Sequence, residues 1–146
     1  MTFVRSKIAC DVASYDPVRL NEDIARGDYP CAPQTRGGSA RMFGIFDVCA
    51  LVVYAQLVRL GLTKRVAGGI ATNVLKGLRE EGADRVDFPL TGFNSDPVYQ
   101  EAGSAPAFQV LTGGEIIRAL TGSLCFDLKN LLREVHGRLN RSGEND

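Results

Sequence analysis

The sequence predicts an α+β fold with a helical N-terminal half and a C-terminal half of short strands and helices. Three observations lead to this prediction. Apolar residues recur at helical spacing through most of residues 6–80, and a stretch rich in glycine and proline at 28–43 separates two pairs of helices. After residue 81, short apolar runs alternate with segments rich in Gly, Pro, Ser and Asn. The chain has 146 residues, of which 45% are hydrophobic and 23% charged, so it can bury a modest core.

Two short helices joined by a tight turn are expected first. Ser6–Ala13 is compatible with a helix, and Asp16 followed by Pro17 is typical of the N-cap and first position of the next helix. Gly27 is a candidate C-cap for this second helix. The inward-facing residues, four apart in each helix, are Ile8 and Val12, then Leu20 and Ile24. Two short helices around a tight turn are the helix-turn-helix pattern.

A β-hairpin is expected between the helix pairs. Gly37 and Gly38 lie between two short extended pieces, which predicts a hairpin over Thr35–Arg41. A hairpin at this place would be the wing of a winged helix-turn-helix.

Two longer helices are expected next, over Ile45–Leu60 and from a cap at Thr63 onward. Their buried stripes are Phe46, Ala50, Val53, Leu57 and Leu60 in the first, and Val66, Ile70, Val74 and Leu78 in the second. Val48–Val58, the longest uncharged stretch in the helical part, is too short to span a bilayer. Residues 1–8 lack the long apolar region of a secretory signal. We therefore expect a cytoplasmic protein with no membrane partner.

The C-terminal half is expected to form strands and a closing helix. The strand candidates are Val86–Leu90, Ala107–Leu111 and Ser123–Phe126, with a loop over Thr91–Pro106 and a short helix over Glu115–Leu120. In the closing helix, Asp127–Leu139, apolar residues recur at spacings of four, three and four. Residues 140–146 form a polar tail.

The composition offers little for a metal site or an active site. Cys10, Cys31, Cys49 and Cys125 lie at least 18 residues apart, and His136 is the only histidine. The pair Gly113-Gly114 is not followed by the Lys-Ser/Thr of a phosphate loop. We expect free, mostly buried thiols, no metal, no cofactor and no enzymatic activity.

The charge distribution is uneven although the net charge is zero. Residues 1–82 contain 11 Lys and Arg against 8 Asp and Glu, and residues 83–146 contain 6 against 9. A basic front half and an acidic back half suit a module that faces DNA joined to one that faces a partner.

A set of residues spread over positions 29–63 resembles the DNA-binding domain of the MerR family. It comprises the run from Tyr29 to Phe43 with its Gly-Gly-x-x-Arg-x-aromatic piece, then Asp47, then Leu60-Gly-Leu-Thr63. The resemblance covers about residues 3–80, and it implies a winged helix-turn-helix in residues 1–82 that binds double-stranded DNA. Residues 83–139 would then be a segment for dimerisation or partner binding.

The chain departs from the family at positions that matter for recognition. Val18, Glu22 and Asp23 stand where the family carries an arginine and a pair of aromatics. The C-terminal half has neither a cysteine-based metal loop nor a long dimerisation helix directly after the domain. The resemblance therefore implies a divergent, bacterial or phage relative that is not a metal sensor, and the family's base contacts do not transfer.

The second helix carries the candidate base-reading residues. Arg19, Glu22, Asp23 and Arg26 are spaced to form one polar face opposite Leu20 and Ile24. In a major groove, Arg19 can read guanine, Asn21 adenine and Glu22 cytosine, and Arg26 suits a phosphate. The alternative is a solvated face held by ion pairs between Arg19 and Glu22 and between Glu22 and Arg26.

The hairpin and the fourth helix carry the candidate phosphate contacts. Arg36 and Arg41 flank the glycine turn, with Thr35 and Ser39 as hydroxyl donors. Lys64 and Arg65, beside the cap of the fourth helix, suit flanking phosphates. The alternative for both groups is an ordinary solvent-facing surface.

A homodimer is expected through the last helix, because paired half-sites are read by two-fold dimers. The candidate dimerisation residues form one apolar stripe: Leu128, Leu131, Leu132, Val135 and Leu139. The alternative is that this stripe packs on the strands of its own chain.

These expectations combine into a sequence-specific transcription regulator, associated with the nucleoid, with repression favoured. One rival is an excisionase-like or DNA-packaging architectural protein. Another is a protein-interaction adaptor that has lost DNA binding, which the acidic pair Glu22 and Asp23 keeps open. The C-terminal segment leaves room for a further protein or small-effector partner.

Overall fold

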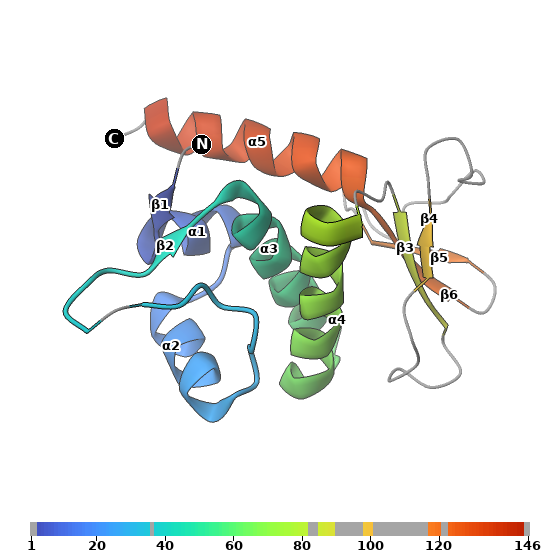
Figure 1. The fold of residues 1–146 in the computed structure, drawn as a ribbon, viewed down its shortest axis with the longest axis horizontal. Coiled ribbons are helices and arrows are strands. Elements are labelled where there is room, and N and C mark those ends of the chain that lie inside the picture. Colours follow the sequence, from blue (N-terminus) through green and yellow to red (C-terminus); the bar gives the residue numbers. More distant parts are fainter. Residues whose placement is uncertain are drawn as a thin grey trace.

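The computed structural model of the protein describes residues 3–35, 37–81, 85–89, 98–100, 117–120 and 123–144. These residues form a mixed α+β structure that is mostly helical (Figure 1). The elements, in chain order, are β1 (Val4–Arg5), α1 (Ser6–Ala13), α2 (Pro17–Arg26), β2 (Met42–Phe43), α3 (Ile45–Arg59), α4 (Lys64–Lys76), the π-helical segment η1 (Gly77–Glu81), β3 (Arg85–Pro89), β4 (Val98–Gln100), β5 (Ile117–Leu120), β6 (Ser123–Asp127) and α5 (Leu128–Glu144).

Helix α3 is the centre of the core. Every residue from 48 to 57 is buried, so this helix is surrounded on all sides by α1, α4 and α5. A helix that is apolar all round is stable in water only in such a position. This explains the long uncharged stretch. Leu60, which we expected on the buried stripe, follows the last helical residue and is exposed.

Helix α2 begins and ends where its capping residues predict. The side chain of Asp16 accepts a hydrogen bond of 2.9 Å from the backbone N–H of Val18, and Pro17 is the first helical residue. Gly27 ends α2 with φ of 81°, a left-handed conformation that favours glycine. Ser14 ends α1 with φ of 55°, and it turns the chain into α2 within three residues.

The hairpin expected over Thr35–Arg41 is not formed as predicted. The described residues of that segment contain no strand, and β2, which follows them, pairs instead with the start of the chain. β1 and β2 are antiparallel, with Val4 opposite Phe43 and Arg5 opposite Met42. Phe43 is completely buried, so this long-range pairing places an aromatic ring in the core, which a local hairpin would not do.

The C-terminal sheet is antiparallel throughout, in the order β4-β3-β6-β5. Its central pair joins Val86 to Phe126, both fully buried, which confirms the strands expected around residues 86–90 and 123–126. The short helix expected over Glu115–Leu120 is wrong for residues 117–120, because these form β5. Pairing with β6 supplies backbone partners that outweigh local helical preference. The strand expected over Ala107–Leu111 lies outside the described residues.

Helix α5 packs on the N-terminal helices and extends to residue 144, into the segment expected to be a tail. Its apolar stripe is turned inward, toward α1 and α3. Leu128, Leu131 and Val135 are completely buried, and Leu132 and Leu139 are half-buried. The expected dimerisation surface is therefore occupied within the chain, mainly by the helices α1 and α3, with a smaller contact to the strand β3 that the alternative supposed. Packing inside one chain avoids the entropic cost of recruiting a partner.

One core consequently joins residues on both sides of residue 82. A hydrogen bond also joins α5 to α1, because the guanidinium of Arg138 donates to the carbonyl oxygen of Val12 at 3.2 Å. Within the described ranges, no helix is both long enough and apolar enough to cross a membrane.

Candidate nucleic-acid interface

Helix α2 has one anchored face and one face open to solvent. Leu20 and Asp23 are buried and Ile24 is half-buried. The exposed side chains, which include four of the predicted base-reading and phosphate residues, are Pro17, Val18, Arg19, Asn21, Glu22, Ala25 and Arg26.

Asp23 is the main anchor of α2, although the sequence predicted it on the solvated face. Its side chain is 0% exposed. One carboxylate oxygen accepts from the ammonium of Lys64 at 2.7 Å, and the other accepts from the hydroxyl of Tyr54 at 2.8 Å and from that of Tyr15. A buried carboxylate needs such partners because desolvation of an unpaired charge is costly. The three donors come from α4, from α3 and from the turn between α1 and α2.

The electrostatics of this cluster keep Asp23 ionised and Tyr15 and Tyr54 protonated. Burial alone raises the pKa of Asp23, but hydrogen bonds from Lys64, Tyr15 and Tyr54 outweigh it and hold the pKa below its usual value. Burial, together with donation to Asp23, raises the pKa of Tyr15 to about 12 and that of Tyr54 further. At neutral pH the carboxyl is therefore ionised and both phenols are protonated donors.

Tyr15 and Tyr54, which donate to this carboxylate, form an aromatic cluster with Tyr29. The ring of Tyr54 meets Tyr15 edge-on with centroids 5.6 Å apart, and it meets Tyr29 at a tilt with centroids 4.7 Å apart. The backbone carbonyl of Asp23 also accepts from Asp28 at 2.9 Å. The end of α2 and the chain that follows it are thus held by the same cluster.

Lys64 and Arg41 are bound within the protein, contrary to the solvent-facing roles expected for them. The side chain of Lys64 is 30% exposed and its ammonium pairs with Asp23, so it is not a free phosphate contact. Arg41 is half-buried and donates to the carbonyl of Pro33, which closes the loop between α2 and β2 on itself. Arg65, Thr35 and Ser39 are exposed, as expected. Arg36 lies outside the described residues.

Helix α4 approaches the chain after α2 very closely. A Cβ added at Gly68 would lie 1.8 Å from the carbonyl oxygen of Asp28, so only glycine fits at this contact. The side chain of Thr63 accepts from the N–H of Val66 at 3.3 Å and caps the helix, as predicted. This brings the start of α4, with Lys64, to Asp23.

Asp47, the acidic residue at the start of the third helix, also has a structural role. Its carboxylate accepts from the backbone N–H of Gly44 at 2.9 Å and from Arg79 at 2.5 Å. The contact with Arg79 ties the start of α3 to the end of the α4–η1 segment.

The sequence reasoning missed two groups of residues. Val18 is 64% exposed and Ala25 is exposed, so the open face of α2 has apolar as well as polar positions. The exposure of Val18 could have been predicted from the sequence, because Val18 does not share the inward-facing positions Leu20 and Ile24. Tyr15 and Tyr54 were missed as partners of Asp23, since 31 residues separate Tyr54 from it.

The described residues bring together no group of three or more His, Cys, Asp and Glu side chains suited to a metal ion. Burial raises the pKa of Cys10 to about 11 and that of Cys49 to about 12, so both buried thiols stay protonated and unreactive at neutral pH.

Neither models of known protein families nor the curated proteins include a match to this chain.

Proposed function

We propose that the protein binds double-stranded DNA through α2 and regulates transcription, with α1, the Ser14 turn and α2 acting as a helix-turn-helix. The observation that carries the proposal is the two-faced character of α2. Its inner face is held at Asp23 by three other parts of the fold, and its outer face is left exposed. A helix held this firmly can present its side chains to base edges without a large ordering cost.

The exposed side chains of α2 suit the major groove. Asn21 can pair with the N6 and N7 positions of adenine, and Arg19 with the O6 and N7 positions of guanine. Val18 and Ala25 offer apolar contact to a thymine methyl group, and Glu22 can accept from cytosine. This mixture of donors, an acceptor and methyl groups is suited to sequence reading rather than to general attraction.

Among the described residues, fewer side chains are available for phosphate contacts than the sequence predicted, and Arg36 lies outside them. Arg26 and Arg65 are exposed cations near α2, and Thr35 and Ser39 add hydroxyl groups on the loop before β2. Lys64 and Arg41 are engaged within the fold. Arg26 and Arg65, the two described cations in this role, should contribute about −2 to the log–log slope of the salt dependence.

Selection of bound sequences from a random DNA pool tests the proposal. The Arg19→Ala and Asn21→Ala variants should each lose about 1–3 kcal/mol at one base pair and relax the selected motif there. Lys76→Ala is the matched control, since Lys76 is exposed on α4 away from its N-terminus and should leave the motif unchanged. If all variants select the same motif as the wild-type protein, α2 does not read bases in the major groove.

An adaptor that binds protein instead of DNA is the second candidate. Glu22, on the exposed face, repels phosphates, and the neighbouring exposed Val18 could pack on a protein partner. Recovery of no DNA from the pool even at low salt would favour this candidate.

A further inference from the structure

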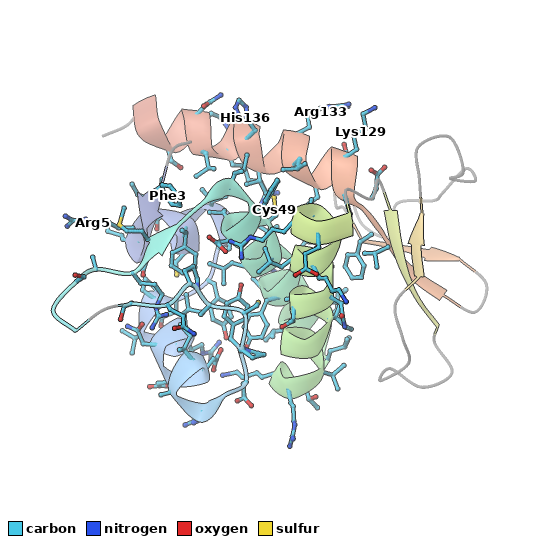
Figure 2. The ribbon with its side chains drawn as sticks, viewed as in Figure 1. Phe3, Arg5, Cys49, Lys129, Arg133 and His136 are labelled. Carbon is cyan, nitrogen blue, oxygen red and sulfur yellow. The ribbon has the colours of Figure 1, made fainter. Side chains whose placement is uncertain are left out.

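The outer face of α5 carries a row of basic and amide side chains. Lys129, Arg133 and His136 are exposed at spacings of four and three, and the exposed Asn140 follows four residues later. Figure 2 shows the three labelled side chains projecting from α5 away from the body of the protein. We call Lys129, Arg133, His136 and Asn140 the α5 row. At a rise of 1.5 Å per residue, the row extends over about 16 Å.

Glu134 is the one acidic residue within residues 128–142. Its side chain is 42% exposed, but it pairs with Arg138 at 3.2 Å and not with a residue of the α5 row. Arg138 in turn points toward α1, where it donates to Val12. The positive charges of Lys129 and Arg133 are therefore not neutralised by their own helix.

The apolar residues of α5 are turned away from the row and buried against α1 and α3. An amphipathic helix that enters a bilayer must offer its apolar face to the lipid, and a peptide groove needs apolar pockets. The outer face of α5 offers neither. A line of cations and amides without apolar neighbours is suited to the phosphates of a nucleic-acid backbone.

The position of α5 decides which phosphates it can reach. In Figure 1, α5 runs along the top of the molecule, and α2 lies at the lower edge, on the other side of α3. A short duplex seated on α2 is stiff, because the persistence length of DNA is about 150 base pairs. It cannot bend around the protein to touch the α5 row.

We propose that the α5 row binds the phosphate backbone of a second duplex, so that one molecule bridges two DNA segments. This inference rests on the proposed function for its first duplex. The contact is electrostatic and independent of base sequence, because it goes to phosphates alone.

Capture of a second duplex tests the bridge. A selected site of about 20 base pairs, too short to bend, is fixed to beads, the protein is added, and a labelled duplex of unrelated sequence is offered at rising salt. Lys129→Gln with Arg133→Gln should lower capture of the labelled duplex about tenfold at moderate salt. Binding to the first duplex, measured separately by anisotropy, should change less than twofold.

The matched control removes the same charge elsewhere. Lys7→Gln with Lys76→Gln, two lysines exposed on α1 and α4, should leave capture unchanged. Arg19→Ala with Asn21→Ala should abolish preference for the selected site while an unrelated duplex still binds through α5. If the selected site binds and capture is absent, or is equal in the α5 variant, the bridge is refuted while the proposed function stands. If no duplex binds, both fail.

A membrane is the other polyanion that the test must separate. Vesicles containing phosphatidylserine are offered to the wild-type protein and to the α5 variant. Loss of vesicle binding in the variant, with duplex capture unaffected, would assign the row to a lipid surface and overturn the bridge.

Discussion

At the residue scale, Asp23 determines how α2 is presented. At its carboxylate, α2, α3, α4 and the turn before α2 are joined by hydrogen bonds. The residue resembles its exposed neighbours Glu22 and Asp16 in the sequence. Its depth in the fold gives it a different role.

The substitution Asp23→Asn tests this anchor. An amide cannot balance the ammonium of Lys64, so we expect a loss of about 2–3 kcal/mol of unfolding free energy, below that of a fully buried pair because Lys64 keeps some water. Urea denaturation followed by circular dichroism measures it. Asp16→Asn is the matched control on the same helix, and it should cost less than about 0.5 kcal/mol because Asn caps as well as Asp. Equal losses in the two variants would contradict the assignment.

The same carboxylate predicts an acid transition. The pKa of Asp23 is lower in the folded protein than its usual value, so its contribution to stability is complete well above about pH 4. That contribution is lost as the pH falls from about 4 through the lower pKa of the folded state. The difference in urea midpoint between wild type and Asp23→Asn should therefore shrink between pH 5 and pH 2.5, taken as approximate limits. A difference that stays constant over this range would show that the ionised form is not what stabilises α2.

At the element scale, α4 packs so closely on Asp28, just after α2, that the α4 residue at the contact can have no side chain. Gly68 occupies this position, and the neighbouring Gly69 is exposed with open space around it. Two adjacent glycines on one helix thus have different roles, which no helical propensity distinguishes.

The pair of substitutions Gly68→Ala and Gly69→Ala tests this difference. A methyl at residue 68 would meet the Asp28 carbonyl, so α4 and the chain after α2 must separate, at a cost of about 3 kcal/mol. A methyl at residue 69 meets nothing within 4 Å and should stabilise the helix by up to about 1 kcal/mol. Thermal unfolding of both variants measures the contrast, and effects of the same sign would show that the close contact is absent.

At the scale of the whole molecule, α5 completes the N-terminal core. Helices α1 and α3 leave an apolar surface that the last helix covers with Leu128, Leu131 and Val135. A dimer of this protein would therefore use another surface than this stripe.

The substitution Val135→Asp distinguishes a core role from an interface role. Val135 is 0% exposed, so an unpaired carboxylate there should cost several kcal/mol and unfold the protein at room temperature. His136→Asp, at the adjacent exposed position, should change stability by less than about 0.5 kcal/mol. Circular dichroism and light scattering report the outcome. If the wild-type protein is a dimer and Val135→Asp is a folded monomer, Val135 lies in a dimer interface and not in the core.

What the sequence determined by itself is the local part of the fold. The bounds of α2 and the cap at Thr63 follow from residues that act on their nearest neighbours, namely Asp16, Pro17, Gly27 and Thr63. The sequence also predicted a helix over Ile45–Leu60, close to α3, but with one buried stripe. Residues 48–57 are instead all buried, because α1, α4 and α5 pack around this helix.

Only the tertiary structure decided the parts that depend on distant partners. β2 pairs with β1 across α1 and α2, and residues 117–120 become a strand because β6 lies beside them. Asp23 is buried because Lys64, 41 residues away, reaches it. The stripe of α5 turns inward because α1 and α3 have apolar surface to cover. Local propensity is a fraction of a kcal/mol per residue, whereas each of these contacts buries a side chain or pairs a charge, so the distant partner prevails.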